Sequence, residues 1–429
     1  MNIVMVTNTY LPHVGGVAKS VSSFTEEYRK MGHRVLVVCP EFPDASEEEK
    51  DVIRLAAIQN FSGGDFSVVL PVPAFLNSRL SEFEPDICHS HHPYLLGNTA
   101  VRIADDFNIP LIFTHHTMYE KYTHYVPADS EKLKSFVIQL ATNYANMCDY
   151  VVAPSSSVRE VIRERGVKTP IQVIPTGVQL DKYKKGNGKS FREEYNIGRD
   201  KFVLGHVGRL APEKNLSFLA NAAACYMEQD EEACFLVVGG GPSEADIRNI
   251  FKEKNMEDRL YMTGKLSGQE LIDSYHAMDM FIFASLTETQ GMVLAEATAA
   301  GLPLVAIDAP GAREVVRDRE NGRLIDEEDL EEFCNAIKWV GKEMRDNPEP
   351  VKQAVHKTAH DFSLNNCAQN ALELYKKTMK KGRLGIIEEH RTIWDELLQD
   401  IRTEWNLLSS ATDALKTAIS EPPHSEEQK

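Results

Sequence analysis

Short apolar runs alternate with amphipathic stretches along most of the chain, and the alternation starts a second time after a polar break. The first series includes NIVMVT, HRVLVVCP and PLIFTHH, and the second includes KFVLGHVGRL, CFLVVGGGP, MDMFIFAS and LPLVAID. Apolar strands separated by helical crossovers are typical of parallel sheets. The break itself, DKYKKGNGKSFREEYN, is polar and fits a linker. The pattern therefore predicts an α/β protein with two doubly wound, Rossmann-like domains that face a cleft.

The division along the chain follows from the same pattern. We place the N-terminal domain at residues 1–188 and the C-terminal domain at residues 189–364. A helix is expected over 365–383, for which packing back on the N-terminal domain is one option, and a helical extension over 384–418. The apolar stripe of the extension fits either a helix packed on the body of the protein or a contact with a partner or a second copy. The polar residues 419–429 are expected to be disordered.

Size, charge and cysteine usage narrow the class of protein. A chain of 429 residues is too long for one ordinary core, and its formal net charge of −17 argues against nucleic acid as a partner. The seven cysteines form no C-x-x-C pair, and the first residues lack the basic and apolar regions of a signal peptide. No run approaches the roughly 20 apolar residues of a membrane span. We therefore expect a cytoplasmic protein with reduced thiols.

Two cations follow a predicted strand in GHVGRLAPEKN, where Arg209 and Lys214 lie in a loop that leads to a helix. Ligands of doubly wound sheets bind beyond the carboxyl ends of the strands. A guanidinium fork and a mobile ammonium group suit a diphosphate. Ordinary surface charge is the alternative for both residues.

Two carboxylates flank the start of a second helix in SLTETQGMVLAEATAAG. The first amides of this helix, at Gly291, Met292 and Val293, have no intrahelical acceptors and predict a phosphate site that glycine lets a ligand approach. Glu288 precedes the helix and Glu296 lies more than one turn inside it, so both are expected to face one cleft. A carboxylate beside a bound phosphate is better suited to accept hydrogen bonds from sugar hydroxyls than to protonate a leaving group.

These segments resemble the motifs of a known family. ETQGMVLAE resembles the E-x7-E motif of the retaining family 4 glycosyltransferases, which have the GT-B fold, and GRLAPEKN is similar to their phosphate-binding loop. VIPTGVQLDKY resembles their entry into the second domain, YLPHVGGVAKSV their N-terminal glycine loop, and SHHPYLLG and FTHHT their N-domain cleft motifs. The resemblance runs in the expected order from residue 1 to about residue 380 and implies a GT-B fold with additional C-terminal helices.

The resemblance also implies roles for the matching residues. Glu288 would contact the donor sugar, and Glu296 would contact the ribose of the nucleotide. The diphosphate would be bound by both cations of the loop and by the helix amides, and the N-domain backbone would approach it at two glycines: Arg209, Lys214, Gly291, Met292, Val293, Gly15 and Gly16. A side chain at either glycine is expected to crowd this approach or strain the turn. The family generally uses no catalytic metal, so we expect no metal, no tightly bound cofactor and a nucleotide sugar, with UDP favoured, as the substrate.

Five histidines follow two neighbouring predicted strands: His89, His91, His92, His115 and His116. The H-x-H-H spacing suits zinc, but no cysteine or acidic ligand accompanies it at a suitable spacing, so a structural role is expected for most of them. By resemblance, His116 is the cleft histidine of the family, near the reacting centre. There it would position donor and acceptor.

The segment HHTMYEKYTHYVP resembles the corresponding stretch of diacylglycerol α-glucosyltransferases within family 4. Its aromatic residues Tyr119, Tyr122, His124 and Tyr125 would lie on the acceptor side, where rings stack on a sugar or glycerol, and helix packing is the alternative. Few cations lie near this stretch or in residues 61–83. Only a weak peripheral contact with the inner face of the membrane is therefore expected.

Together the motifs predict a retaining glycosyltransferase that moves a hexose, with UDP-glucose favoured, to an alcohol acceptor such as diacylglycerol or another glycolipid precursor. Transfer to a soluble sugar acceptor is the next alternative. A nucleotide-sugar epimerase or a glycoside phosphorylase on the same fold would act without this acceptor. A nucleotide-sugar sensor with partner-binding C-terminal helices would bind the donor without turnover.

Overall fold

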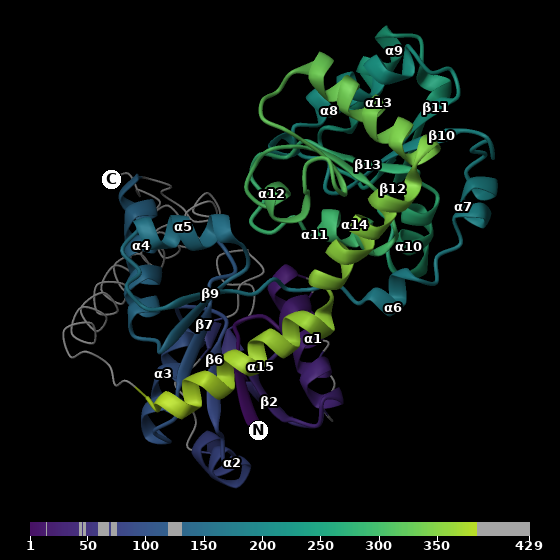
Figure 1. The fold of residues 1–429 in the computed structure, drawn as a ribbon. Helices are drawn as coiled ribbons and strands as arrows, with labels where there is room; N and C mark the ends of the chain where they lie inside the picture. Colours follow the sequence, from purple (N-terminus) through teal and green to yellow (C-terminus); the bar gives the residue numbers. More distant parts are fainter. Residues whose placement is uncertain are drawn as a thin grey trace, which may run out of the picture.

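The computed structural model describes residues 1–13, 15–42, 45, 49–58, 68–69, 75–118 and 131–383. These residues form two lobes, each built on a parallel sheet with helices on its faces (Figure 1), which confirms the predicted α/β class. The expected helical extension at 384–418 and the expected tail at 419–429 lie outside the described residues. Among the helices of the described ranges, none combines the length and the apolar composition that a membrane span requires.

Seven parallel strands form the first sheet in the order β3-β2-β1-β6-β7-β8-β9. These strands are β1 (Asn2–Val6), β2 (Arg34–Pro40), β3 (Val52–Leu55), β6 (Ile87–Ser90), β7 (Leu111–Thr114), β8 (Tyr150–Ala153) and β9 (Ile171–Val173). The helices of this domain are α1 (Gly16–Lys30), α2 (Phe75–Phe83), α3 (Leu96–Asp106), α4 (Glu131–Asn146) and α5 (Ser156–Glu164). A separate antiparallel pair consists of β4 (Ala57–Ile58) and β5 (Val68–Val69).

Six parallel strands form the second sheet in the order β12-β11-β10-β13-β14-β15. These strands are β10 (Phe202–Val207), β11 (Ala233–Val238), β12 (Leu260–Gly264), β13 (Met280–Phe283), β14 (Leu304–Ile307) and β15 (Gly322–Ile325). Its helices are α8 (Leu216–Met227), α9 (Glu244–Glu253), α10 (Gly268–His276), α11 (Met292–Ala299), α12 (Ala312–Val315), α13 (Leu330–Asp346) and α14 (Pro348–Asp361), with short 3-10 turns η3 (Pro212–Lys214) and η4 (Glu257–Arg259).

The strands are apolar along their length because helices cover both faces of each sheet. Every residue is buried in β11, whose sequence is ACFLVV, and in β13, whose sequence is MFIF. Residues of the two faces of the second sheet belong to two separate hydrophobic clusters. Such continuous apolar runs are what a parallel sheet with two covered faces requires.

The strand order of each sheet creates one point at which neighbouring loops diverge. In the first sheet β1 lies between β2 and β6, and in the second β10 lies between β11 and β13. Ligands of doubly wound sheets bind at such a switch point, beyond the carboxyl ends of the strands. In the second sheet this geometry brings the loop after β10 next to the loop after β13. Lys214 of the first loop contacts Glu288 of the second, although the two residues are 74 positions apart in the chain.

Two segments connect the domains, and they pair with each other. The Val178 amide donates to the Phe362 carbonyl and the Leu364 amide donates to the Val178 carbonyl, both at 2.8 Å. The alternation predicts a division at residue 188. Helix α7 (Gly188–Glu194) packs on the second domain as this division implies, but α6 (Leu180–Tyr183), which precedes it, packs there too. Tyr183 of α6 belongs to a core cluster of the second sheet, so the first crossing precedes α6.

The helix α15 (Leu364–Lys381) returns from the second domain and lies along the first (Figure 1). Its apolar face, from Leu364 to Tyr375, is buried with residues of α1, β1 and β2 in one core cluster. The rings of Tyr28 on α1 and Tyr375 meet edge to face, with centroids 5.7 Å apart. Packing on the N-terminal domain, one option from the sequence, is therefore the arrangement of this helix.

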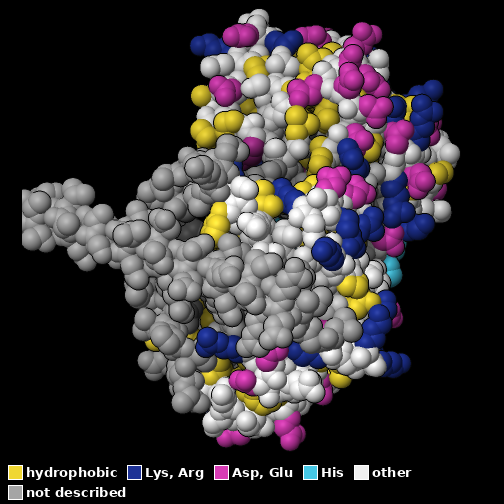
Figure 2. All heavy atoms as spheres, turned by 90° about the vertical axis from the view of Figure 1, so that its left-hand side faces the viewer, with side chains coloured by type: hydrophobic (Ala, Val, Ile, Leu, Met, Phe, Trp, Pro, Cys, Tyr) yellow, Lys and Arg dark blue, Asp and Glu magenta, His cyan; other side chains and the backbone are white. Residues whose placement is uncertain are grey.

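Charge is not spread evenly over the face of the molecule drawn in Figure 2. Asp and Glu side chains cluster over the upper part of the second domain, whereas Lys and Arg side chains gather lower down, toward the first domain. The net charge of −17 therefore describes the chain as a whole and not each part of its surface.

Candidate active site

The loops after β10 and β13 are joined by side-chain contacts at the switch point of the second sheet. The carbonyl of Glu213 accepts hydrogen bonds from the Ser285 hydroxyl at 3.2 Å and from the Thr287 hydroxyl at 3.4 Å. Directly beside them, the Lys214 ammonium group forms a hydrogen-bonded ion pair with the Glu288 carboxylate. These side chains are 19% and 22% exposed, so the pair is partly shielded from water.

Arg209 differs from Lys214 in its surroundings. Its guanidinium group pairs with the Glu213 carboxylate, and its side chain is 65% exposed. An exposed ion pair contributes about 0–1 kcal/mol, so an anion can displace the Glu213 carboxylate at little cost. Both cations expected from the sequence thus lie at the switch point, and each pairs with a carboxylate.

The start of α11 requires glycine. Gly291 precedes the helix with a φ of +68°, and a Cβ at this position would lie 2.5 Å from the Gly311 carbonyl oxygen. Inside the helix, the Leu294 amide already donates to the Gly291 carbonyl at 3.0 Å. The amides of Gly291, Met292 and Val293 therefore precede the hydrogen-bonded turns, as predicted for an anion-binding helix start.

Glu296 lies deeper than Glu288 and is held by different groups. Its carboxylate accepts a hydrogen bond from the buried Tyr275 hydroxyl at 3.0 Å through Oε2. Its other oxygen, Oε1, lies 3.6 Å from the ammonium group of Lys19 on α1 of the first domain. Burial and the Glu296 carboxylate both raise the pKa of Tyr183 and of Tyr275, so two protonated phenols face this carboxylate. The two glutamates consequently have unequal environments, one beside a cation and one between tyrosines and the facing domain.

The loop between β1 and α1 carries the two glycines expected to approach the ligand. Gly15 has extended backbone with a φ of −166°, and neither it nor Gly16 has a positive φ. A Cβ at Gly16 would meet no atom within 4 Å, and one at Gly15 would lie 3.2 Å from the His13 ring. The expectation that a side chain strains the turn is therefore wrong, because this backbone conformation is open to any residue. Crowding of a ligand remains the predicted reason for glycine here.

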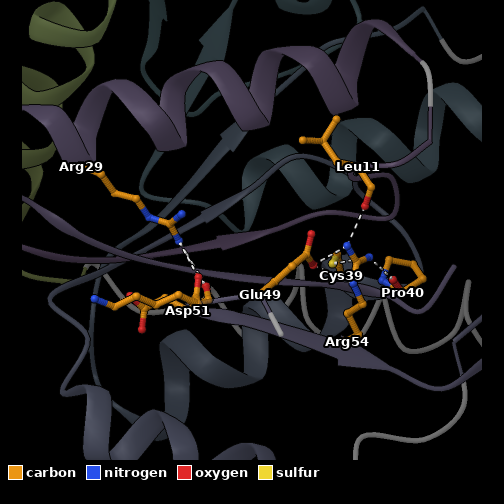
Figure 3. A network of polar contacts seen from close by, with 8 residues as sticks. Leu11, Arg29, Cys39, Pro40, Glu49, Asp51 and Arg54 are labelled. Carbon is orange, nitrogen blue, oxygen red and sulfur yellow. Dashed lines mark hydrogen bonds and ion pairs between the residues drawn. The ribbon is translucent and has the colours of Figure 1, made fainter. Parts of the chain in front are cut away.

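The same loop is held at its middle by Arg54 of β3 (Figure 3). The Arg54 guanidinium group donates to the Leu11 carbonyl at 2.7 Å and to the Pro40 carbonyl at 3.3 Å, and it pairs with Glu49 at 2.5 Å. Arg29 of α1, by contrast, donates to the carbonyls of Val35 at 2.8 Å and of Asp51 at 3.4 Å. Arg54 thus ties the loop that leads to Gly15 to the edge of the first sheet.

The histidines follow β6 and β7, which are neighbours in the first sheet. The Asn8 amide donates to Nδ1 of His92 at 3.1 Å, and Nδ1 of His91 lies 2.9 Å from Nε2 of His116. His116 is half-buried, whereas His89, His91, His92 and His115 are buried. Burial lowers the pKa of His89 and of His92 to about 3, so these rings are neutral. Among the described residues, no group of three or more His, Cys, Asp or Glu side chains has an arrangement that could hold a metal ion.

The expected acceptor-side residues Tyr119, Tyr122, His124 and Tyr125 lie outside the described residues, and their roles stay predictions.

Family models match both halves of the chain. The model described as Glycosyltransferase Family 4 matches residues 14–182, and the model described as Glycosyl transferases group 1 matches residues 188–357. An alpha-monoglucosyldiacylglycerol synthase of Streptococcus pneumoniae is 30% identical over 76% of this chain and 75% of its own length. The chain belongs to the family 4 glycosyltransferases. Its resemblance to the diacylglycerol glucosyltransferases of that family is thereby confirmed.

Two further proteins are similar to this glycosyltransferase. A GDP-mannose-dependent alpha-mannosyltransferase of Corynebacterium glutamicum is 28% identical over 79% of this chain and 80% of its own length. The structure of HepE of Anabaena, solved in complex with UDP, superposes with a TM-score of 0.68 at 18% identity and covers 88% of this chain and 100% of HepE. The predicted GT-B fold is confirmed by this superposition.

The sequence predicts no role for three further residues that contact the site of this glycosyltransferase: Lys19, Glu213 and Tyr275. Glu213 lies within the quoted loop GRLAPEKN, and its spacing of four from Arg209 is a signal for a local ion pair. Lys19 and Tyr275 reach Glu296 from other elements, and neither has a sequence pattern that indicates this contact.

Proposed function

We propose that this glycosyltransferase moves glucose from UDP-glucose to diacylglycerol, with retention of the anomeric configuration, in contact with the membrane that supplies this lipid. The observation that carries the donor part is the meeting of Lys214, Glu288 and the start of α11 at one switch point. Similarity to an alpha-monoglucosyldiacylglycerol synthase supports a lipid acceptor, and similarity to a UDP-bound structure supports UDP.

Donor binding in this proposal is an exchange of partners. The diphosphate takes the place of Glu288 on Lys214 and of Glu213 on Arg209, and its oxygens accept hydrogen bonds from the first amides of α11. Release of Glu288 frees its carboxylate to accept hydrogen bonds from hydroxyls of the sugar. Because Lys214 and Glu288 pair with each other before the donor binds, binding of the diphosphate to Lys214 also releases Glu288 to bind the sugar.

Departure of the nucleotide then leaves negative charge on phosphate oxygens. Lys214, Arg209 and the helix start stabilise that charge, which is the main electrostatic requirement of this reaction. The acceptor hydroxyl attacks the anomeric carbon from the face that the phosphate leaves, and the leaving phosphate oxygen takes its proton. Glu296 fixes the ribose, and His116 fixes the sugar and the acceptor at the first domain.

One alternative has a specific observation in its favour. The relative from Corynebacterium glutamicum is named for GDP-mannose, so the same site geometry is compatible with a second base and sugar. A screen of nucleotide sugars against lipid and soluble acceptors, read by mass spectrometry with and without lipid vesicles, separates these possibilities. Product only with UDP-glucose and diacylglycerol vesicles is expected. Product with GDP-mannose would overturn the proposed donor, and product with a soluble sugar alone would overturn the proposed lipid acceptor. Sugar release or isomerisation without acceptor would indicate a phosphorylase or an epimerase.

The site itself is tested by paired substitutions. Glu288→Gln and Lys214→Ala are expected to abolish transfer, and Glu296→Gln is expected mainly to weaken donor binding. Glu213→Gln is the matched control, because it removes a carboxylate that pairs with the other cation but that has no proposed contact with the sugar. Transfer that persists from every nucleotide sugar in both Glu288→Gln and Lys214→Ala would refute the assignment.

A further inference from the structure

Three histidine rings form a stack at the carboxyl edge of the first sheet. The ring centroids of His89 and His91 are 4.3 Å apart, and those of His91 and His116 are 5.2 Å apart with an interplanar angle of 30°. His89 and His91 are buried, and only His116, at one end of the stack, is half-buried. The stack therefore leads from the interior of the first domain to the residue expected at the cleft.

The inner end of this stack is fixed by the returning helix. Nδ1 of His89 lies 2.5 Å from the Tyr375 hydroxyl of α15, and its Nε2 lies 2.7 Å from the Thr114 hydroxyl. The Tyr375 hydroxyl also contacts the Tyr28 hydroxyl at 3.1 Å. Both ring nitrogens of His89 are thus occupied, so His89 supports His91 by stacking and has no nitrogen left to bond it.

His91 has one occupied and one unoccupied nitrogen. Its Nδ1 is hydrogen-bonded to Nε2 of His116 at 2.9 Å, whereas its own Nε2 is buried without a hydrogen-bond partner among the described residues. A neutral imidazole has one donor and one acceptor nitrogen, so one ring must donate and the other accept in this bond. Burial and the neighbouring histidines lower the pKa of His91 and of His116 well below the ordinary value, which keeps both rings neutral.

The two possible directions of this bond differ in what they leave buried. If His116 donates, the proton of His91 sits on Nε2, a buried N–H without a protein acceptor. If His91 donates from Nδ1, its Nε2 is a bare acceptor. Among backbone groups of native proteins, buried N–H groups without a partner are rarer than under-satisfied carbonyl acceptors, and we apply the same preference to the imidazole nitrogens. The second direction is therefore favoured, and it places the proton of His116 on Nδ1.

We propose that His91 is a positioning residue that holds His116 as the Nδ1–H tautomer, so that the ring nitrogen of His116 not bonded to His91 is a hydrogen-bond donor and not a base. This inference rests on the proposed function of the cleft as the donor-sugar site. A donor at this position can bind a sugar hydroxyl or a phosphate oxygen, and it cannot remove the proton of the acceptor. It thus agrees with transfer of that proton to the leaving phosphate.

The tautomer can be measured without any substrate. Long-range ¹H–¹⁵N correlation spectra of ¹⁵N-histidine-labelled enzyme report which nitrogen of each neutral ring carries the proton, and the His116→Gln variant assigns the His116 signals by their loss. A protonated Nδ1 and a bare Nε2 for His116 are expected. The opposite tautomer would overturn the proposal; it would require an acceptor for His91 Nε2, such as one water in the adjoining cavity of about 20 Å³.

Two substitutions of His91 test the functional consequence. In His91→Asn the amide nitrogen takes the place of Nδ1 and can still donate to His116, whereas His91→Leu offers no donor. We expect His91→Leu to mix the His116 tautomers and to lower kcat by about 100-fold, the scale of a misplaced reacting group. The nucleotide Kd should stay unchanged, and His91→Asn should restore the tautomer and most of kcat. Equal kcat values for the two variants would refute the positioning role. If no nucleotide sugar and acceptor supports turnover, the proposed function fails, while the tautomer measurement still decides the state of His116.

Discussion

Replacing Tyr275 with phenylalanine removes a single hydroxyl group from the support of Glu296. Tyr275 is fully buried, and its hydroxyl donates to Oε2 of Glu296 at 3.0 Å. Burial, followed by the Glu296 carboxylate, raises the pKa of Tyr275 well above its ordinary value, so the hydroxyl remains a donor throughout the working pH range. The ring itself stays in place in Tyr275→Phe, because it packs on Tyr183 and Phe281.

The size of the effect follows from the kind of bond that is lost. A hydrogen bond to a charged group contributes about 1.5–3 kcal/mol to stability. Glu296 is only 8% exposed, so water has little access to replace the hydroxyl. We expect the free energy of unfolding to fall by about 2 kcal/mol. A loss of about 1.4 kcal/mol in the orientation of Glu296 toward the ribose would raise the Kd for the nucleotide about tenfold.

Urea unfolding and calorimetric titration with UDP measure these two quantities. Tyr226→Phe is the matched control, because the Tyr226 hydroxyl also donates to a carboxylate at 3.0 Å, that of Asp230, away from the switch point. This control should lose stability and bind UDP as the wild type does. Wild-type affinity in Tyr275→Phe, with the expected loss of stability, would refute the reasoning that Tyr275 orients Glu296 for the nucleotide.

Three other changes have defined outcomes. Gly291→Ala places a Cβ 2.5 Å from a backbone oxygen at a φ of +68°, so it should abolish UDP binding in titrations and cost more than the about 1–2 kcal/mol of a left-handed residue in urea unfolding. Arg54→Met frees the loop that leads to Gly15 and should weaken UDP binding. The control Arg29→Met should lower only the free energy of unfolding. Equal UDP affinities of the two variants would contradict this role of Arg54. Burial lowers the pKa of His206 to about 4, below the roughly 6.5 of the unfolded chain. The unfolded state therefore binds more protons between these values, so the free energy of unfolding should fall as pH decreases from about 6.5 to about 4, and His206→Phe should reduce this slope by up to about 1.4 kcal/mol per pH unit.

The two sheets could be predicted from the sequence because each depends on a local pattern. A strand buried on both faces reads as a continuous apolar run, and Gly291 before a small-residue helix indicates a helix start that a phosphate can approach. The position of α6 could not be predicted this way. Its polar, lysine-rich residues could equally belong to a linker or to the exposed side of a helix whose other side, here Tyr183, is buried.

The pairings within the site depend on contacts that sequence spacing does not encode. Lys214 and Glu288 could each be assigned to a ligand from its motif, but their ion pair requires the register of two loops 74 positions apart. The bond between His89 and Tyr375 spans 286 positions and two domain crossings. The histidine pattern alone therefore predicts a structural role for most of these rings, and the fixed stack follows only from the position of α15.

The return of α15 also sets an order of events during synthesis. The core cluster that covers one face of the first sheet includes Leu364, Cys367, Leu372 and Tyr375 along with residues from the first strands of the chain. Domains generally fold as units while the ribosome makes the chain, the N-terminal one first. In this protein, Tyr28 and His89 of the N-terminal domain therefore stay uncovered until the second domain has been translated and α15 has emerged from the ribosome. The domain made first is thus the one completed last, and the apolar face that α15 covers stays exposed until then.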